Sequence, residues 1–95
     1  MNQVGVTPNG IIIVDGIFKM FDTMGLPLAD LFELCQSRNM WPSMPHFYDD
    51  AIKAGWKHKT VILRLREALG DVKGTEYAEE VIKRLEAKYG EDTAV

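Results

Sequence analysis

The sequence predicts an all-α fold, a compact bundle of about five short helices with an extended arm at its N-terminus. Apolar residues recur at helical spacing in five successive segments after residue 14, and β-branched residues dominate the segment before it. The 95 residues, 46% hydrophobic and 26% charged, suffice for one globular domain with a modest core. We therefore predict an arm at residues 1–14, a helical domain at 15–90 and a flexible tail at 91–95.

The arm favours extended backbone. Val4, Val6 and the run Ile11–Val14 suit β-strands, and residues 8–10 between them (Pro-Asn-Gly) are typical of a turn. Two short strands around this turn form a β-hairpin, which by itself is only marginally stable in water. We therefore expect the arm to be partly mobile, to pack on the helices, or to pair with a strand of a partner.

The first three helices are predicted at residues 15–25, 27–39 and 43–55. Gly25 and Gly55 are natural C-terminal stops, because glycine accepts the left-handed backbone conformation at a helix end. Each helix carries an apolar stripe that predicts its buried face. The stripes are Ile17, Phe18, Phe21 and Met24; Leu28, Leu31, Phe32 and Cys35; and Met44, Phe47, Tyr48, Ala51 and Ile52.

The last two helices are predicted at residues 57–70 and 75–90. Gly70 and Gly90 are their predicted stops, and Thr75 is a predicted N-cap. Acidic residues come first and basic residues later in the final helix, an order that suits the helix dipole. The apolar stripes are Val61, Ile62, Leu65 and Leu69, and then Tyr77, Val81, Leu85 and Tyr89.

The break between the second and third helices has the layout of a helix-turn-helix, with a short turn after Asn39 and a new helix capped by Ser43. In such DNA-binding motifs the first residues of the second helix usually face the base edges. Residues 43–47 include none of the Arg, Lys, Asn or Gln side chains that read bases best, and Asp49 and Asp50 would repel phosphates. Two interpretations stay open, a DNA-reading motif and an ordinary corner of a helical core.

The segment from residue 27 to 52 resembles the N-terminal helix-turn-helix of phage terminase small subunits, in which a leucine-rich helix and a cysteine precede a Met-Pro turn, a serine and an aromatic residue. The residues on this pattern are Leu28, Leu31, Cys35, Met40, Pro42, Ser43 and Phe47. Trp41 inside the turn and the pair Asp49 and Asp50 depart from it. The resemblance implies specific DNA binding, ring-like oligomers and no catalysis by the small subunit itself.

Charge is unevenly distributed along the chain, whose net charge is −3. Residues 53–70 carry five basic groups and one acidic group, whereas both flanking segments are net acidic. Such a basic island can neutralise phosphates, and Trp56 within it can either stack on a base or fold back to close the third helix. The candidate nucleic-acid-binding residues are Lys53, Lys57, His58, Lys59, Arg64 and Arg66.

No catalytic or metal-binding motif stands out. Cys35, His46 and His58 supply neither the four ligands nor the paired spacing of a structural zinc site, and Cys35 falls on an apolar stripe, as expected of a buried, inert thiol. The sequence lacks a Gly-rich phosphate loop and a serine nucleophile elbow. We therefore expect a non-enzymatic protein with no catalytic residue, metal, cofactor or small-molecule substrate.

The single cysteine, the lack of a signal-peptide pattern and the shortness of the longest aliphatic run, Ile11–Val14, predict a cytoplasmic protein without membrane contact. The last residues, DTAV, match the form that PDZ-type domains recognise, as well as an ordinary frayed terminus.

Two functions agree with these features. The first is a small phage-type protein that binds DNA, or helps to package it, through the basic island. The alternative is a protein–protein interaction module, an accessory factor that docks on a host or virion protein, or associates with itself, through the arm and exposed aromatic side chains. Its candidate partner-binding residues are Ile11, Ile12, Ile13, Trp41 and Trp56.

Overall fold

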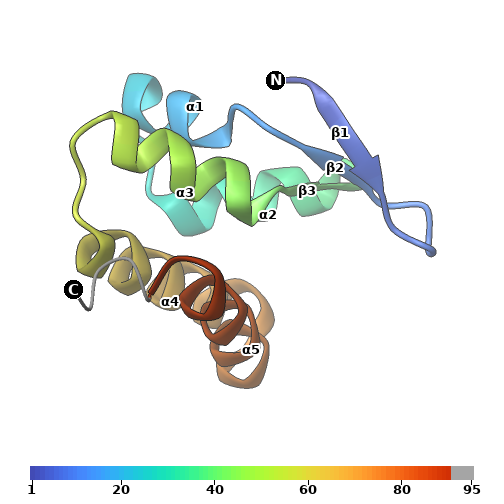
Figure 1. Cartoon of the computed structure of the whole chain (residues 1–95). Coiled ribbons are helices and arrows are strands. Elements are labelled where there is room, and N and C mark those ends of the chain that lie inside the picture. Colours follow the sequence, from blue (N-terminus) through green and yellow to red (C-terminus); the bar gives the residue numbers. More distant parts are fainter. Residues whose placement is uncertain (91–95) are drawn as a thin grey trace.

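The computed structural model describes residues 1–90, which form five α-helices, a short π-helical turn and a three-stranded sheet (Figure 1). The elements are β1 (Gln3–Val6), β2 (Ile12–Val14), α1 (Ile17–Met24), α2 (Leu28–Ser37), β3 (Met40–Pro42), α3 (Met44–Lys53), α4 (His58–Lys73), α5 (Thr75–Leu85) and η1 (Glu86–Gly90). A mostly helical fold with five helices is therefore confirmed, and a small sheet is added to it. The predicted tail and its DTAV motif lie outside the described residues.

The sheet joins the N-terminal arm to the corner between α2 and α3. β1 and β2 form the predicted hairpin, and β2 pairs in parallel with β3, with Ile12 opposite Met40. Asn39, at φ 57°, donates a 3.0 Å side-chain hydrogen bond to the carbonyl of Gly10 and so fixes the corner to the hairpin. The arm therefore pairs with a strand of its own chain. The predicted helix-turn-helix corner is not confirmed, because the turn forms β3.

Glycines follow the ends of α1 and α3 as predicted, whereas α5 ends as an α-helix at Leu85 and continues as η1 to the predicted stop at Gly90. Gly55, at φ 98°, ends α3 in a Schellman motif, in which the Trp56 N–H donates to the carbonyl of Ala51 at 3.0 Å. The predicted stop at Gly70 is wrong, since α4 continues to Lys73.

Gly74, at φ 94°, takes the turn instead and leads directly into α5. Thr75 is accordingly the first residue of α5 and not its cap.

The core lies between two groups of elements. In Figure 1, α4 and α5 pair with each other in the lower part, and α1, α3 and the sheet form the upper part. Phe32, Phe47 and Leu65 are among the fully buried side chains that join the two parts, and most of the predicted stripe residues are buried with them. Cys35 is also buried, and this burial raises the pKa of its thiol, while nearby Arg38 acts in the opposite direction. Among the described helices, none is long and apolar enough to cross a membrane.

Candidate functional site

Three of the predicted nucleic-acid-binding residues gather at the corner between α3 and α4. Lys53 ends α3, Lys57 precedes α4, and Lys59 lies in the first turn of α4; all three are exposed. None forms an ion pair with another described residue. We call this cluster the lysine corner. Two of its positive charges lie at the N-terminus of α4, where the helix dipole disfavours them, and no carboxylate of the described residues compensates them.

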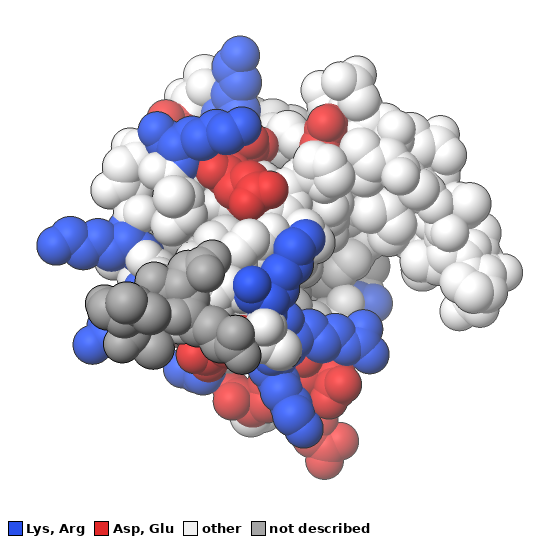
Figure 2. All heavy atoms as spheres, in the orientation of Figure 1, with Lys and Arg blue, Asp and Glu red and all other residues white. Residues whose placement is uncertain are grey.

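The two arginines of the basic island lie elsewhere. They are two residues apart on α4 and therefore point in directions about 200° apart around the helix. Arg66 donates from Nε to the Oε2 of Glu79 on α5 at 2.8 Å, and the guanidinium of Arg64 lies 6.0 Å from the ring centroid of Trp56. The basic island is therefore continuous in sequence but divided in space, and basic and acidic side chains alternate over the helical part of Figure 2.

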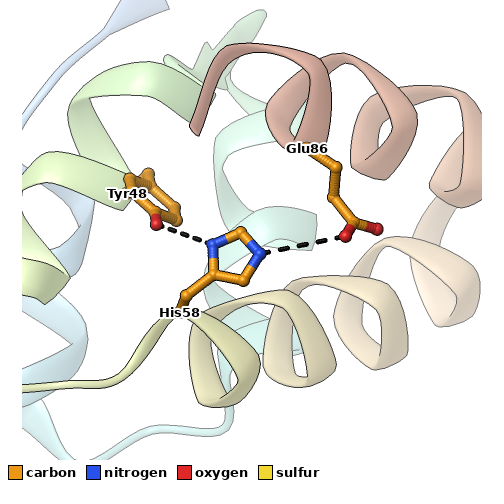
Figure 3. Close-up of polar contacts among 3 residues, drawn as sticks. All are labelled: Tyr48, His58 and Glu86. Carbon is orange, nitrogen blue, oxygen red and sulfur yellow. Dashed lines mark hydrogen bonds and ion pairs between the residues drawn. The ribbon is translucent and has the colours of Figure 1, made fainter. Parts of the chain in front are cut away.

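His58 connects three elements (Figure 3). The hydroxyl of Tyr48, on α3, lies 2.7 Å from its Nδ1, and the Oε2 of Glu86, on η1, lies 3.8 Å from its Nε2. A neutral imidazole that carries its proton on Nε2 can accept a hydrogen bond from the Tyr48 hydroxyl at Nδ1 and direct its Nε2–H toward Glu86. The Tyr48 ring also stacks on Tyr89, with ring centroids 4.0 Å apart. These contacts fasten the end of the described chain to the corner between α3 and α4.

A hollow of about 310 Å³ opens beside this histidine. It is lined by His58, Lys59, Ile62, Leu63, Arg66 and Glu86. The structure thus brings three predicted binding residues together with a carboxylate, a mixed-charge lining that does not select for an anion. No group of three or more His, Cys, Asp or Glu residues within the described chain could hold a metal ion. His46 forms a 2.7 Å hydrogen bond between its Nδ1 and the hydroxyl of Ser43.

The predicted partner-binding residues are less exposed than their sequence suggests. Ile11, Ile12 and Ile13 are half-buried against the core. Trp41 is only 8% exposed and lies against Phe32. Trp56 is half-buried, and its ring meets two phenylalanine rings of α1 edge to face. Both tryptophans therefore belong mainly to the packing.

The hairpin forms an exposed surface without charged side chains, which the overall composition does not indicate. Residues 1–14 contain no charged side chain, although 26% of the chain is charged. Figure 2 shows the result as an entirely white lobe at its right, where Figure 1 has the hairpin. Val4 and Val6 on β1 are 43% and 60% exposed, and Val6 continues into a cross-strand row with Ile12 and Met40. β1 is an end strand of this sheet.

A second hollow, which sequence reasoning missed, lies between β3, the start of α3 and α5. We call it the α5 groove; its volume is about 370 Å³. It is lined by Ile13, Trp41, Pro42, Ser43, Met44, Pro45, Tyr77, Val81, Arg84, Leu85 and Lys88. Both charged residues of this lining are cationic. No local signal could have revealed the groove, because its walls come from segments about 40 residues apart that meet only when α5 packs against α3.

The inner wall of the α5 groove is aromatic. The rings of Trp41 and Tyr77 meet edge to face at 6.0 Å, and the Nζ of Lys73 lies 4.7 Å from the Trp41 ring centroid. The buried Trp41 N–H has no acceptor in hydrogen-bonding geometry among the described residues. Burial raises the pKa of Tyr77, while the nearby Trp41 indole and Arg84 lower it. The groove thus has a rigid aromatic wall next to cationic residues.

Comparison with known protein families, with curated proteins and with solved structures finds no match for this chain. The resemblance of residues 27–52 to terminase small subunits therefore stays a prediction, and so does the DNA-related function that it implies.

Proposed function

We propose that this chain is a protein-binding module that pairs the edge of β1 with an extended segment of a partner protein. The observation that carries the proposal is an end strand in an arm without charged side chains. Natural sheets usually protect such edges with lysine, proline or a covering loop, because an open edge invites another strand. Strand addition is also a common way in which proteins recognise extended peptides.

The exposed face of the hairpin indicates what the partner segment is like. Val6, Ile12 and Met40 form an apolar row across the sheet, and Val4, which lies where the register between β1 and β2 shifts, is also exposed. A fourth strand beside β1 would extend this row if it placed apolar side chains at alternate positions. We therefore expect the binding partner to be an uncharged segment rich in β-branched residues.

A peptide library displayed on a surface and selected against the intact chain tests this proposal. We expect the selected peptides to alternate apolar residues and to slow amide hydrogen exchange in β1. Lysine at both Val4 and Val6 should weaken their binding by an order of magnitude or so, because strand pairing then buries charge. The matched control is Leu63→Lys on α4, a residue that is 53% exposed. Peptides that bind the double-lysine variant as well as the unchanged chain would contradict the proposal.

The lysine corner supports a second candidate, the DNA-binding or DNA-packaging accessory function that the terminase resemblance implies. Lys53, Lys57 and Lys59 are exposed and unpaired within the described chain, so they are free to neutralise phosphates. A gel-shift titration with mixed-sequence duplex DNA at about 50 mM salt favours phosphate contacts most strongly. Binding that disappears in the variant with Lys57→Glu and Lys59→Glu supports this candidate, and no binding at that salt concentration refutes it.

A further inference from the structure

We propose that the α5 groove binds a short peptide segment of a partner protein in which a carboxylate side chain lies next to a large apolar side chain. This site is separate from the β1 edge and does not depend on it. The occupant follows from three features of the groove, namely its size, its charge and its aromatic wall.

The size and lining of the groove suit side chains. Its volume of about 370 Å³ falls in the range of roughly 300–1,000 Å³ in which proteins bind small groups. Pro42, Met44 and Pro45 form one side, and Val81 and Leu85 form the other. Proline carries no N–H at two of these positions, so the first side offers mainly apolar surface. An apolar side chain of a partner can fill such a space without leaving polar groups unpaired.

The charge of the groove selects an acidic neighbour for that side chain. Arg84 and Lys88 lie four residues apart, so they project from the same side of the C-terminal helical segment. Lys88 has no ion-pair partner among the described residues, and its Nζ lies 5.2 Å from the Tyr89 ring centroid. Arg84 contacts Glu80 at 3.5 Å, but this pair is exposed on both sides and so contributes little. A partner carboxylate can therefore bind both cations at small cost.

The helix dipole alone does not explain why these two cations lie at the groove. Basic residues near the end of a helix suit its dipole, and this accounts for their presence in that turn. It does not account for a lining in which both charged residues are cationic, within a chain of net charge −3. Lys73 does not line the groove, but its Nζ lies 4.7 Å from the ring centroid of Trp41, which does. The charged residues of the lining are thus opposite in sign to the net charge of the chain.

Trp41 provides a direct readout of occupancy. The chain has two tryptophans, so a ¹H–¹⁵N correlation spectrum contains two indole N–H signals, and the Trp56→Phe variant identifies that of Trp41. The probe is the capped tetrapeptide Phe-Asp-Leu-Glu, in which apolar and acidic residues alternate. The control peptide has Lys in place of both acidic residues. We expect the acidic peptide, and not the basic one, to shift the Trp41 indole and the amides of Val81 and Lys88.

A charge-reversal pair gives the decisive comparison. Arg84→Glu with Lys88→Glu should weaken binding about tenfold, since two exposed attractions become repulsions. Lys57→Glu with Lys59→Glu makes the same change of net charge at the lysine corner and should leave binding unchanged. All four positions are exposed, and the spectra themselves show whether each variant is folded.

Three results would overturn the inference: no shift at millimolar acidic peptide, equal binding of the basic peptide, or unchanged binding by the groove variant. Light scattering adds a fourth. A dimer that dissociates in the groove variant would show that a second copy, and not a foreign peptide, occupies the site. None of these results bears on the β1 edge, which is read from its own exchange data.

Discussion

Replacement of Trp56 by alanine distinguishes a packing role from a base-stacking role for this residue. Trp56 follows the glycine that ends α3, and its ring centroid lies 5.2 Å from that of Phe18 and 5.9 Å from that of Phe21, both edge to face. A residue whose purpose is to stack on nucleic acid would present its face to solvent. Trp56 instead joins the end of α3 to α1.

The expected loss can be worked out from these contacts. A half-buried tryptophan keeps roughly 100 Å² of apolar surface from water, which is worth about 2.5 kcal/mol at 25 cal/mol per Å². Each edge-to-face pair adds about 0.5–1.5 kcal/mol. We therefore expect Trp56→Ala to lower the free energy of unfolding by about 3.5–5.5 kcal/mol, and Trp56→Phe to lower it by much less, because phenylalanine keeps most of the contact.

Urea denaturation followed by far-ultraviolet circular dichroism measures this loss as a lower midpoint with an unchanged slope. The control is Leu63→Ala, because Leu63 is an exposed apolar residue of α4. A loss below about 1 kcal/mol for Trp56→Ala would refute the packing argument. The stacking interpretation would then regain support if the same variant bound DNA more weakly.

Other predictions concern single contacts. Gly55→Ala should cost about 1–2 kcal/mol because of its φ of 98°, whereas Gly70→Ala, inside α4 with open space around it, should stabilise by up to about 1 kcal/mol; thermal melts compare the two. Tyr48→Phe should cost about 1–2 kcal/mol in urea melts, since it removes the hydrogen-bond partner of the His58 Nδ1, and an unchanged midpoint would contradict this. Burial raises the pKa of Cys35 above 9.0, so the folded state keeps its proton when the unfolded state loses it. Stability should therefore fall as pH rises from about 9 through the folded-state pKa, and Cys35→Ala should make that fall shallower; parallel curves for both chains would refute it.

The helical part of the fold was largely predictable because its signals are local. Apolar spacing identified each helix, and Gly55 marked a true helix end. The predicted helix end at Gly70 was wrong because a glycine ends a helix only where the backbone takes a left-handed conformation. In this chain Gly74, and not Gly70, has a positive φ. β3 was unpredictable for a related reason: Met40, Trp41 and Pro42 form a strand only because β2 lies beside them.

The candidate sites were predictable in proportion to how local they are. The lysine corner survives as a cluster because Lys57 and Lys59 are neighbours in sequence and Lys53 ends the preceding helix. Arg66 lies apart from the lysine corner and pairs with Glu79 on α5, a contact between helices that the sequence does not indicate. The α5 groove depends entirely on how α5 packs, so apolar periodicity placed Tyr77 on a core face without indicating the hollow beside it.

The parallel pairing of β2 with β3 also sets the order in which this chain can acquire its structure. Parallel strands need a long crossover, which here contains α1 and α2. During synthesis the uncharged run Ile11–Val14 leaves the ribosome before the strand that will cover its edge has been made. The pairing of β2 with β3 must therefore wait until the crossover and β3 have been made, although the β1–β2 hairpin is local and can form earlier. Until then the apolar edge of β2 stays open in a newborn chain, on the side of the hairpin opposite to the β1 edge.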